Sequence, residues 1–249
     1  MGATAPPRYD APMPAPTSSP WPQFLLGTQL FLPVAVSIAA YGVVWGVLAG
    51  QAGLSPLEVL LMSGLVYAGS SQFVALDLWS TSALPVVSII IAAAVINLRM
   101  LLMTATLRPL FAGTSRWRAT LSMFLVSDEV WAMTMAQSAK GAASPAFMLG
   151  AGALAWLAWV GSTLIGRLLG AVIADPATYG LDFAFTAVFL ALLFSMWRGR
   201  GDLLPWIVGA LLAIVTERYI PGQWYVIAGG LGGSLAGALA ESWRSRNVA

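Results

Sequence analysis

The stretch GLVYAGSSQFVALDLW, residues 64–79, decides the fold because it ends an apolar run long enough to cross a bilayer, yet has a polar centre at Gly69–Gln72. Small residues let membrane helices approach closely, which is one interpretation of this centre. An amide in hydrocarbon needs hydrogen-bond partners, however, and irregular backbone at membrane depth occurs only inside protein or beside a cavity. The second interpretation, which we predict, is a broken helix whose new N-terminus at 70–72 offers N–H groups to a substrate carboxylate.

The composition is that of a membrane protein. Hydrophobic residues make up 59% of the 249 and charged residues only 9%, and the mean hydropathy is +0.81, whereas soluble domains carry about 25% charged residues. The chain has no cysteine and no histidine, which excludes disulfides, thiolate metal sites and imidazole bases. The net charge of +2 forms no basic patch for nucleic acid. We expect no metal, no cofactor and no enzymatic activity.

Hydropathy predicts an all-α polytopic membrane protein with about seven to eight membrane segments, one or two of them discontinuous. A bilayer core of ~30 Å needs roughly 20 apolar helical residues. The qualifying runs are 24–49, 57–79, 84–107, 117–138, 145–173, 181–197, 203–219 and 222–241. The first 23 residues hold seven of the fifteen prolines and are expected to be a disordered tail. The transport domain then covers 24–241, and 242–249 is a polar C-terminal tail.

Two blocks of sequence recur in the same order. Residues 64–76, GLVYAGSSQFVAL, align without gaps on 180–192, GLDFAFTAVFLAL, and LPVVSIIIAAAV at 84–95 echoes LPWIVGALLAIV at 204–215. Apolar helices can resemble one another by composition, but two blocks in one order favour a repeat. We therefore predict two related halves, 24–138 and 145–241, in which Thr186 is the counterpart of Ser70. If each half holds one segment that does not fully cross, the halves are inverted repeats, a common plan in transporters.

Charged residues inside the third and fourth runs form the second candidate site. Arg99 lies ~12 Å from the end of its run, and a charge at the bilayer centre costs roughly 2.5–3.5 kcal/mol. Asp128 and Glu129 lie about 17–20 Å along the fourth run. A short loop joins the two runs, so Asn97, Arg99 and Asp128 are expected at similar depths. Asp128 and Glu129 point about 100° apart, so one of them is expected to face the arginine, as a functional pair or as a structural one.

The motifs YAGSSQFVAL, NLRMLLMTATLRPLF, SDEVWAM and GLDFAFTAVFLALL occur in this order. They resemble the AzlC family, the large subunit of bacterial branched-chain amino-acid exporters, and the similarity runs from about residue 24 to 240. The resemblance implies export of leucine, isoleucine and valine, with methionine or toxic analogues, across the cell inner membrane by a multi-pass protein. It also implies a small AzlD-like membrane partner. Members of the family often carry a histidine where this chain has Met100, so any coupled proton must be carried here by carboxylates.

A branched-chain amino acid is a zwitterion with an apolar tail, which requires cationic, anionic and apolar contacts. Arg99 or the amides of residues 70–72 suit its carboxylate, and Asp128 or Glu129 suits its ammonium. The candidate substrate-binding residues are Gly69, Ser70, Ser71, Gln72, Phe73, Asn97, Arg99, Met103, Thr186 and Phe189, of which Phe73, Met103 and Phe189 are expected to contact the tail. The candidate proton-coupling residues are Asp128 and Glu129.

Two further classes of function remain open from the sequence. A passive channel would also explain a polar midplane, but it would show no saturable counterflow. A membrane scaffold that transports nothing would use Arg99 and Asp128 only as a structural pair.

Overall fold

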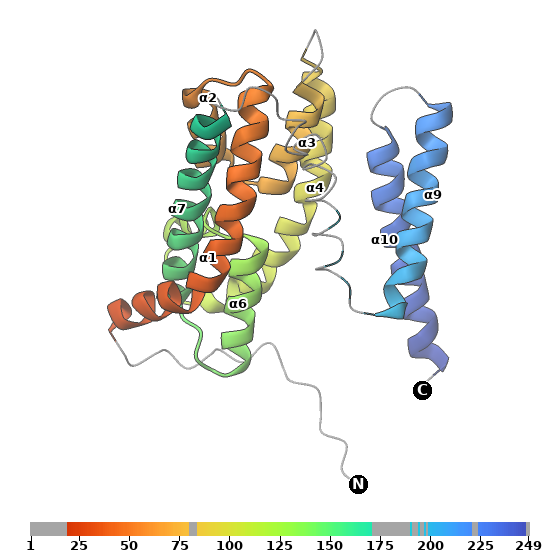
Figure 1. Cartoon of the computed structure of the whole chain (residues 1–249). Coiled ribbons are helices and arrows are strands. Elements are labelled where there is room, and N and C mark those ends of the chain that lie inside the picture. The colour runs from red at the N-terminus through yellow and green to blue at the C-terminus, as the bar shows by residue number, and fades with distance from the viewer. Residues whose placement is uncertain are drawn as a thin grey trace. The chain divides into compact units, whose positions relative to one another are not determined.

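The computed structural model describes residues 19–79, 84–170, 190, 194, 197, 199–220 and 224–247. These residues contain helices and no strand. The helices are α1 (Pro20–Gln51), α2 (Pro56–Leu61), the π-helical turn η1 (Met62–Val66), α3 (Gly69–Trp79), α4 (Val86–Leu107), the 3₁₀ turn η2 (Arg108–Phe111), α5 (Arg116–Met123), α6 (Asp128–Ala139), α7 (Pro145–Gly170), the 3₁₀ turn η4 (Arg200–Asp202), α9 (Leu203–Tyr219) and α10 (Trp224–Asn247) (Figure 1). The all-α class predicted from the sequence agrees with these elements.

Three helical segments within the described ranges are long and apolar enough to cross a membrane: Pro20–Gln51, Val86–Phe111 and Pro145–Gly170. The first begins four residues before the start that hydropathy predicts, at Pro20 rather than at residue 24. Proline is well placed there because the first turn of a helix needs no donor from its N–H. The total of seven or eight segments stays a prediction, and most of the predicted run 181–197 lies outside the described residues.

The chain divides into two compact units, each built from separate stretches of sequence. Unit 1 comprises Met1–Val47, Ser55–Ala68 and Arg99–Leu169. Unit 2 comprises Leu48–Leu54, Gly69–Leu98 and Gly170–Ala249. The predicted halves 24–138 and 145–241 stay a prediction, because block 180–192 falls almost entirely on residues that the structure does not describe.

Glycines bring α1 and α7 together inside unit 1, where the two helices lie side by side (Figure 1). A methyl group built on Gly150 would overlap the backbone of Phe24, and one built on Gly166 would overlap the backbone of Val43. Thr28 Oγ1 donates a hydrogen bond to the carbonyl of Gly150 at 3.1 Å, across the same contact. Small residues allow this close approach, which maximises van der Waals contact between helices in lipid. The α1–α7 pair is therefore the rigid frame of unit 1.

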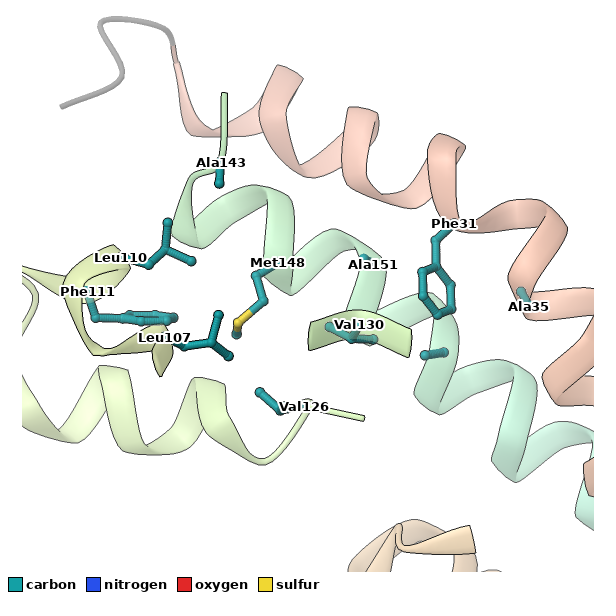
Figure 2. Close-up of a cluster of buried hydrophobic side chains, with 11 residues drawn as sticks. Phe31, Ala35, Leu107, Leu110, Phe111, Val126, Val130, Ala143, Met148 and Ala151 are labelled. Atoms are coloured by element: carbon teal, nitrogen blue, oxygen red, sulfur yellow. The ribbon is translucent and has the colours of Figure 1, made fainter. Parts of the chain in front are cut away.

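A cluster of buried apolar side chains ties α4 and α6 to that frame (Figure 2). Phe31 comes from α1, Leu107 from the end of α4, Val130 from α6 and Met148 from α7. All four are at most 1% exposed. Val130 lies two residues after Asp128, so the cluster fixes the start of α6, and Leu107 fixes the end of the helix that carries Arg99. The core of unit 1 thus positions both members of the predicted charge pair.

In unit 2, α9 and α10 form a closely packed pair. A methyl group on Gly209 would lie 3.0 Å from the carbonyl of Gly229, and one on Gly233 would lie 2.9 Å from the carbonyl of Pro205. Apolar residues of α9 such as Leu211 are exposed away from this contact. Small residues toward a neighbouring helix and large apolar residues on the outside are typical of helices surrounded by lipid.

Candidate functional site

The run 57–79 is broken, as the sequence predicts, and the break lies immediately before Gly69. After α2 the chain forms the π-helical turn Met62–Val66, and α3 begins at Gly69. Between them Tyr67 adopts the left-handed conformation, with φ 47° and ψ 46°; it is the one non-glycine residue with positive φ in the part of the chain that the structure describes. Such strain persists only where surrounding structure enforces it, and it clusters at functional sites. Sequence reasoning did not single out Tyr67.

Trp156 of α7 holds the π-helical turn in place. Its Nε1 donates a hydrogen bond to the carbonyl of Gly64 at 3.0 Å. The neighbouring Ser63 is completely buried. Because a π-helical turn disturbs the regular backbone hydrogen bonds, irregular backbone at membrane depth needs such protein partners. The sequence carries no signal for this contact, since a tryptophan 92 positions away meets a backbone carbonyl.

The first turn of α3 carries the small and polar residues Gly69–Gln72 that the sequence analysis emphasises. Ser71, Gln72 and Phe73 are buried, and Gly69 and Ser70 are half-buried. The Nδ2 of Asn97, on α4, donates a hydrogen bond to Ser71 Oγ at 3.1 Å. All of these residues belong to unit 2. The structure therefore brings Asn97 together with the Gly-Ser-Ser-Gln motif.

The predicted run 117–138 is not one helix, and this corrects the expected depth of the two acids. α5 ends at Met123, and α6 begins at Asp128. Asp128 and Glu129 therefore form the first turn of a new helix. The Oγ of Ser127 accepts a hydrogen bond from the amide of Val130 at 3.3 Å, which is the usual N-cap interaction. Acids in a first turn are further stabilised by the helix dipole.

An ion pair joins α4 to this helix start. Arg99 Nη2 lies 2.9 Å from Asp128 Oδ2, and the two side chains are 33% and 39% exposed. The adjacent Glu129 instead accepts a hydrogen bond from Ser127 Oγ at 2.8 Å. One acid of the two therefore meets the arginine, as the 100° offset between neighbouring helical residues predicts.

The two breaks meet within unit 1. The rings of Tyr67 and Phe124 lie with centroids 6.0 Å apart and planes tilted by 42°. The Tyr67 side chain lies near Ser127 and within electrostatic reach of the Glu129 carboxylate. We call Tyr67, Arg99, Ser127, Asp128 and Glu129 the polar cluster of unit 1. It combines a guanidinium, two carboxylates and two hydroxyls, which are the groups that a zwitterion requires.

Of the three remaining substrate-binding candidates, Met103 lies among the described residues. Met103 is half-buried on α4, and its carbonyl accepts a hydrogen bond from Thr106 Oγ1 at 2.7 Å. Thr186 and Phe189 lie outside the described residues. Within the described ranges no group of three or more acidic side chains is arranged to hold a metal ion.

Comparison with known proteins gives one family. The model of the AzlC protein family matches residues 33–173, a span that includes both breaks and the ion pair. A membrane protein of Archaeoglobus fulgidus is 33% identical over 71% of this chain and 77% of its own length. The inner membrane protein YgaZ of Escherichia coli is 29% identical over 94% of this chain and 96% of its own length. The branched-chain amino acid transport protein AzlC of Bacillus subtilis is 23% identical over 83% and 81%. No solved structure matches the chain.

Proposed function

The chain belongs to the AzlC family, and on this basis we propose that it is a secondary transporter that exports leucine, isoleucine and valine, with methionine or toxic analogues, across the bacterial inner membrane. The named relatives support this proposal: one is a branched-chain amino acid transport protein and another an inner membrane protein. The apolar helices of the chain agree with a membrane location. The observation that carries the proposal is the Arg99–Asp128 ion pair beside two interrupted helices.

The ion pair suits an amino acid because its charges mirror those of a zwitterion. If the pair opens, Arg99 can bind the substrate carboxylate in a bidentate manner. Asp128, or its neighbour Glu129, then receives the ammonium. Each charge exchanges one ionic partner for another, so no uncompensated charge is left in a region of low dielectric constant.

Proton coupling follows if a proton and the substrate compete for one carboxylate. A carboxylate that loses its cationic partner in an apolar region becomes neutral by binding a proton. One of the two acids at the start of α6, Asp128 or Glu129, would bind the ammonium on the cytoplasmic side, and a proton from outside would replace the substrate there. The proton moves inward while the amino acid moves outward. The chain contains no histidine that could take this role.

The resemblance also leads us to propose a small AzlD-like membrane subunit as partner. The test is uptake of labelled leucine into inverted inner-membrane vesicles that contain the full chain, with and without that subunit. The proposal predicts saturable uptake that is accelerated by an acidic vesicle interior, and exchange of internal for external leucine. A passive channel would give uptake that neither saturates nor shows counterflow. If the chain were a scaffold, leucine uptake would equal that of vesicles that lack the chain.

A further inference from the structure

Tyr67 has a buried hydroxyl that forms no hydrogen bond in the described part of the chain. Buried tyrosine hydroxyls usually have a partner, and an unsatisfied one in a native protein calls for an explanation, such as a bound ligand. The same residue carries the strained left-handed backbone at the first break. Two independent irregularities therefore coincide at this one side chain.

The surroundings of Tyr67 anchor its ring and leave its hydroxyl among acceptor groups. The ring packs against the apolar core of unit 1 and against Phe124. The hydroxyl lies near the Ser127 side chain and within electrostatic reach of the Glu129 carboxylate, and no hydrogen bond to the hydroxyl is formed by the described residues. Ser127 donates its own proton to Glu129 instead. The Tyr67 oxygen, the serine hydroxyl and the carboxylate thus lie together at the start of α6.

This arrangement fits an ammonium group. An alkylammonium has three N–H donors and one positive charge, and it needs acceptors, at least one of them anionic. Tyr67 Oη supplies a neutral acceptor and Glu129 an anionic one. Glu129 is exposed and forms no ion pair with any described residue. A carboxylate at the same place would be repelled by Glu129.

We propose that Tyr67 Oη, together with the Glu129 carboxylate, binds the ammonium group of the transported amino acid. The proposal rests on the proposed amino-acid transport and adds a substrate-contacting residue to it. Arg99, held by the neighbouring Asp128, is then the partner of the substrate carboxylate. The two ends of the zwitterion are thereby received by opposite charges, all of them within unit 1.

The test compares three ligands on the full chain reconstituted in lipid vesicles. Labelled leucine reports binding, 3-methylbutan-1-amine retains the ammonium and the tail, and 4-methylpentanoate retains the carboxylate and the tail. Tyr67→Phe keeps the ring and removes only the hydroxyl. It should weaken the binding of leucine and of the amine by about tenfold or more, since a hydrogen bond to a charged group is lost. The affinity for 4-methylpentanoate should be unchanged. Tyr41→Phe, a half-buried tyrosine elsewhere in unit 1, should alter none of the three affinities.

A second variant covers the case in which Tyr67→Phe fails to fold. Glu129→Gln keeps the side-chain volume and removes the charge. It should weaken the binding of the amine but not the binding of 4-methylpentanoate. Unchanged affinities for all three ligands in Tyr67→Phe would overturn the proposal while leaving transport intact. If Tyr67→Phe weakened the binding of 4-methylpentanoate and left that of the amine unchanged, the hydroxyl would belong to the substrate carboxylate. That result would overturn the proposal too. Failure of the natural chain to bind leucine would reject the proposed function itself.

Discussion

Arg99 Nη2 on α4 and Asp128 Oδ2 at the first position of α6 lie 2.9 Å apart, so the middle of one helix is joined to the start of another by an ion pair. The apolar core holds both helices, because Leu107 and Val130 are buried close to the two charges in sequence. The pair is therefore built on a rigid frame. Each side chain is nevertheless more than 30% exposed, so the pair can open without unfolding the unit.

The first prediction separates a functional ion pair from a structural one. Arg99→Met or Asp128→Leu alone should destabilise the protein more than both together, because a single change leaves one charge without its partner. The free energy of unfolding of the double variant should lie within about 1 kcal/mol of that of the natural chain, yet the variant should transport no leucine. Thermal unfolding in detergent and vesicle uptake measure the two quantities. Normal uptake by the double variant would show that the pair is only structural.

The second prediction concerns Gln72 in the first turn of α3, which is 1% exposed. Gln72→Leu keeps nearly the same volume but removes an amide from the buried polar cluster around Ser71 and Asn97. We expect membrane insertion at the natural level and leucine transport lowered at least about tenfold, the loss expected for one hydrogen bond to a charged group. Gln51→Leu at the exposed end of α1 is the matched control and should transport normally. Full transport by Gln72→Leu would remove this motif from the site.

The third prediction tests the frame formed by α1 and α7. Gly150→Ala places a methyl group against the backbone of Phe24, which cannot move aside as a flexible side chain would. Overpacking of this kind costs about 1–3 kcal/mol. A methyl group on Gly161, on the same helix, meets no atom within 4 Å, and Gly161→Ala should be neutral or slightly stabilising. Equal melting temperatures for the two variants would show that the close approach is absent.

Some of the site could be predicted from the sequence because local chemistry determined it. The break before Gly69 follows from small and polar residues in an apolar run. The Arg99–Asp128 pair was predicted from opposite charges on two runs expected to form a hairpin, and the pair forms although η2 and α5 lie between α4 and α6. The second break was missed although Ser127 followed by two acids is a typical helix start. The apolar residues on both sides concealed that signal, because a hydropathy average over the run 117–138 does not register a cap.

Other features depend on tertiary structure and could not be predicted. Tyr67 adopts its left-handed conformation because the surrounding helices impose it, and tyrosine itself disfavours that conformation. The hydrogen bond from Trp156 to Gly64 depends on how α7 packs against the π-helical turn. The repeat of 64–76 in 180–192 stays a prediction, since the second block falls mostly outside the described residues.

The most direct test of proton-coupled export is Asp128→Asn, which keeps the side-chain volume and removes the titrating group. In inverted vesicles that hold the full chain and the small subunit, we predict that this variant still exchanges labelled for unlabelled leucine. It should fail to accumulate leucine when the vesicle interior is acidified, whereas the natural chain accumulates it. Glu129→Gln serves as the parallel variant for the neighbouring acid. Full accumulation by both variants would contradict a carboxylate-coupled exporter built on this helix start.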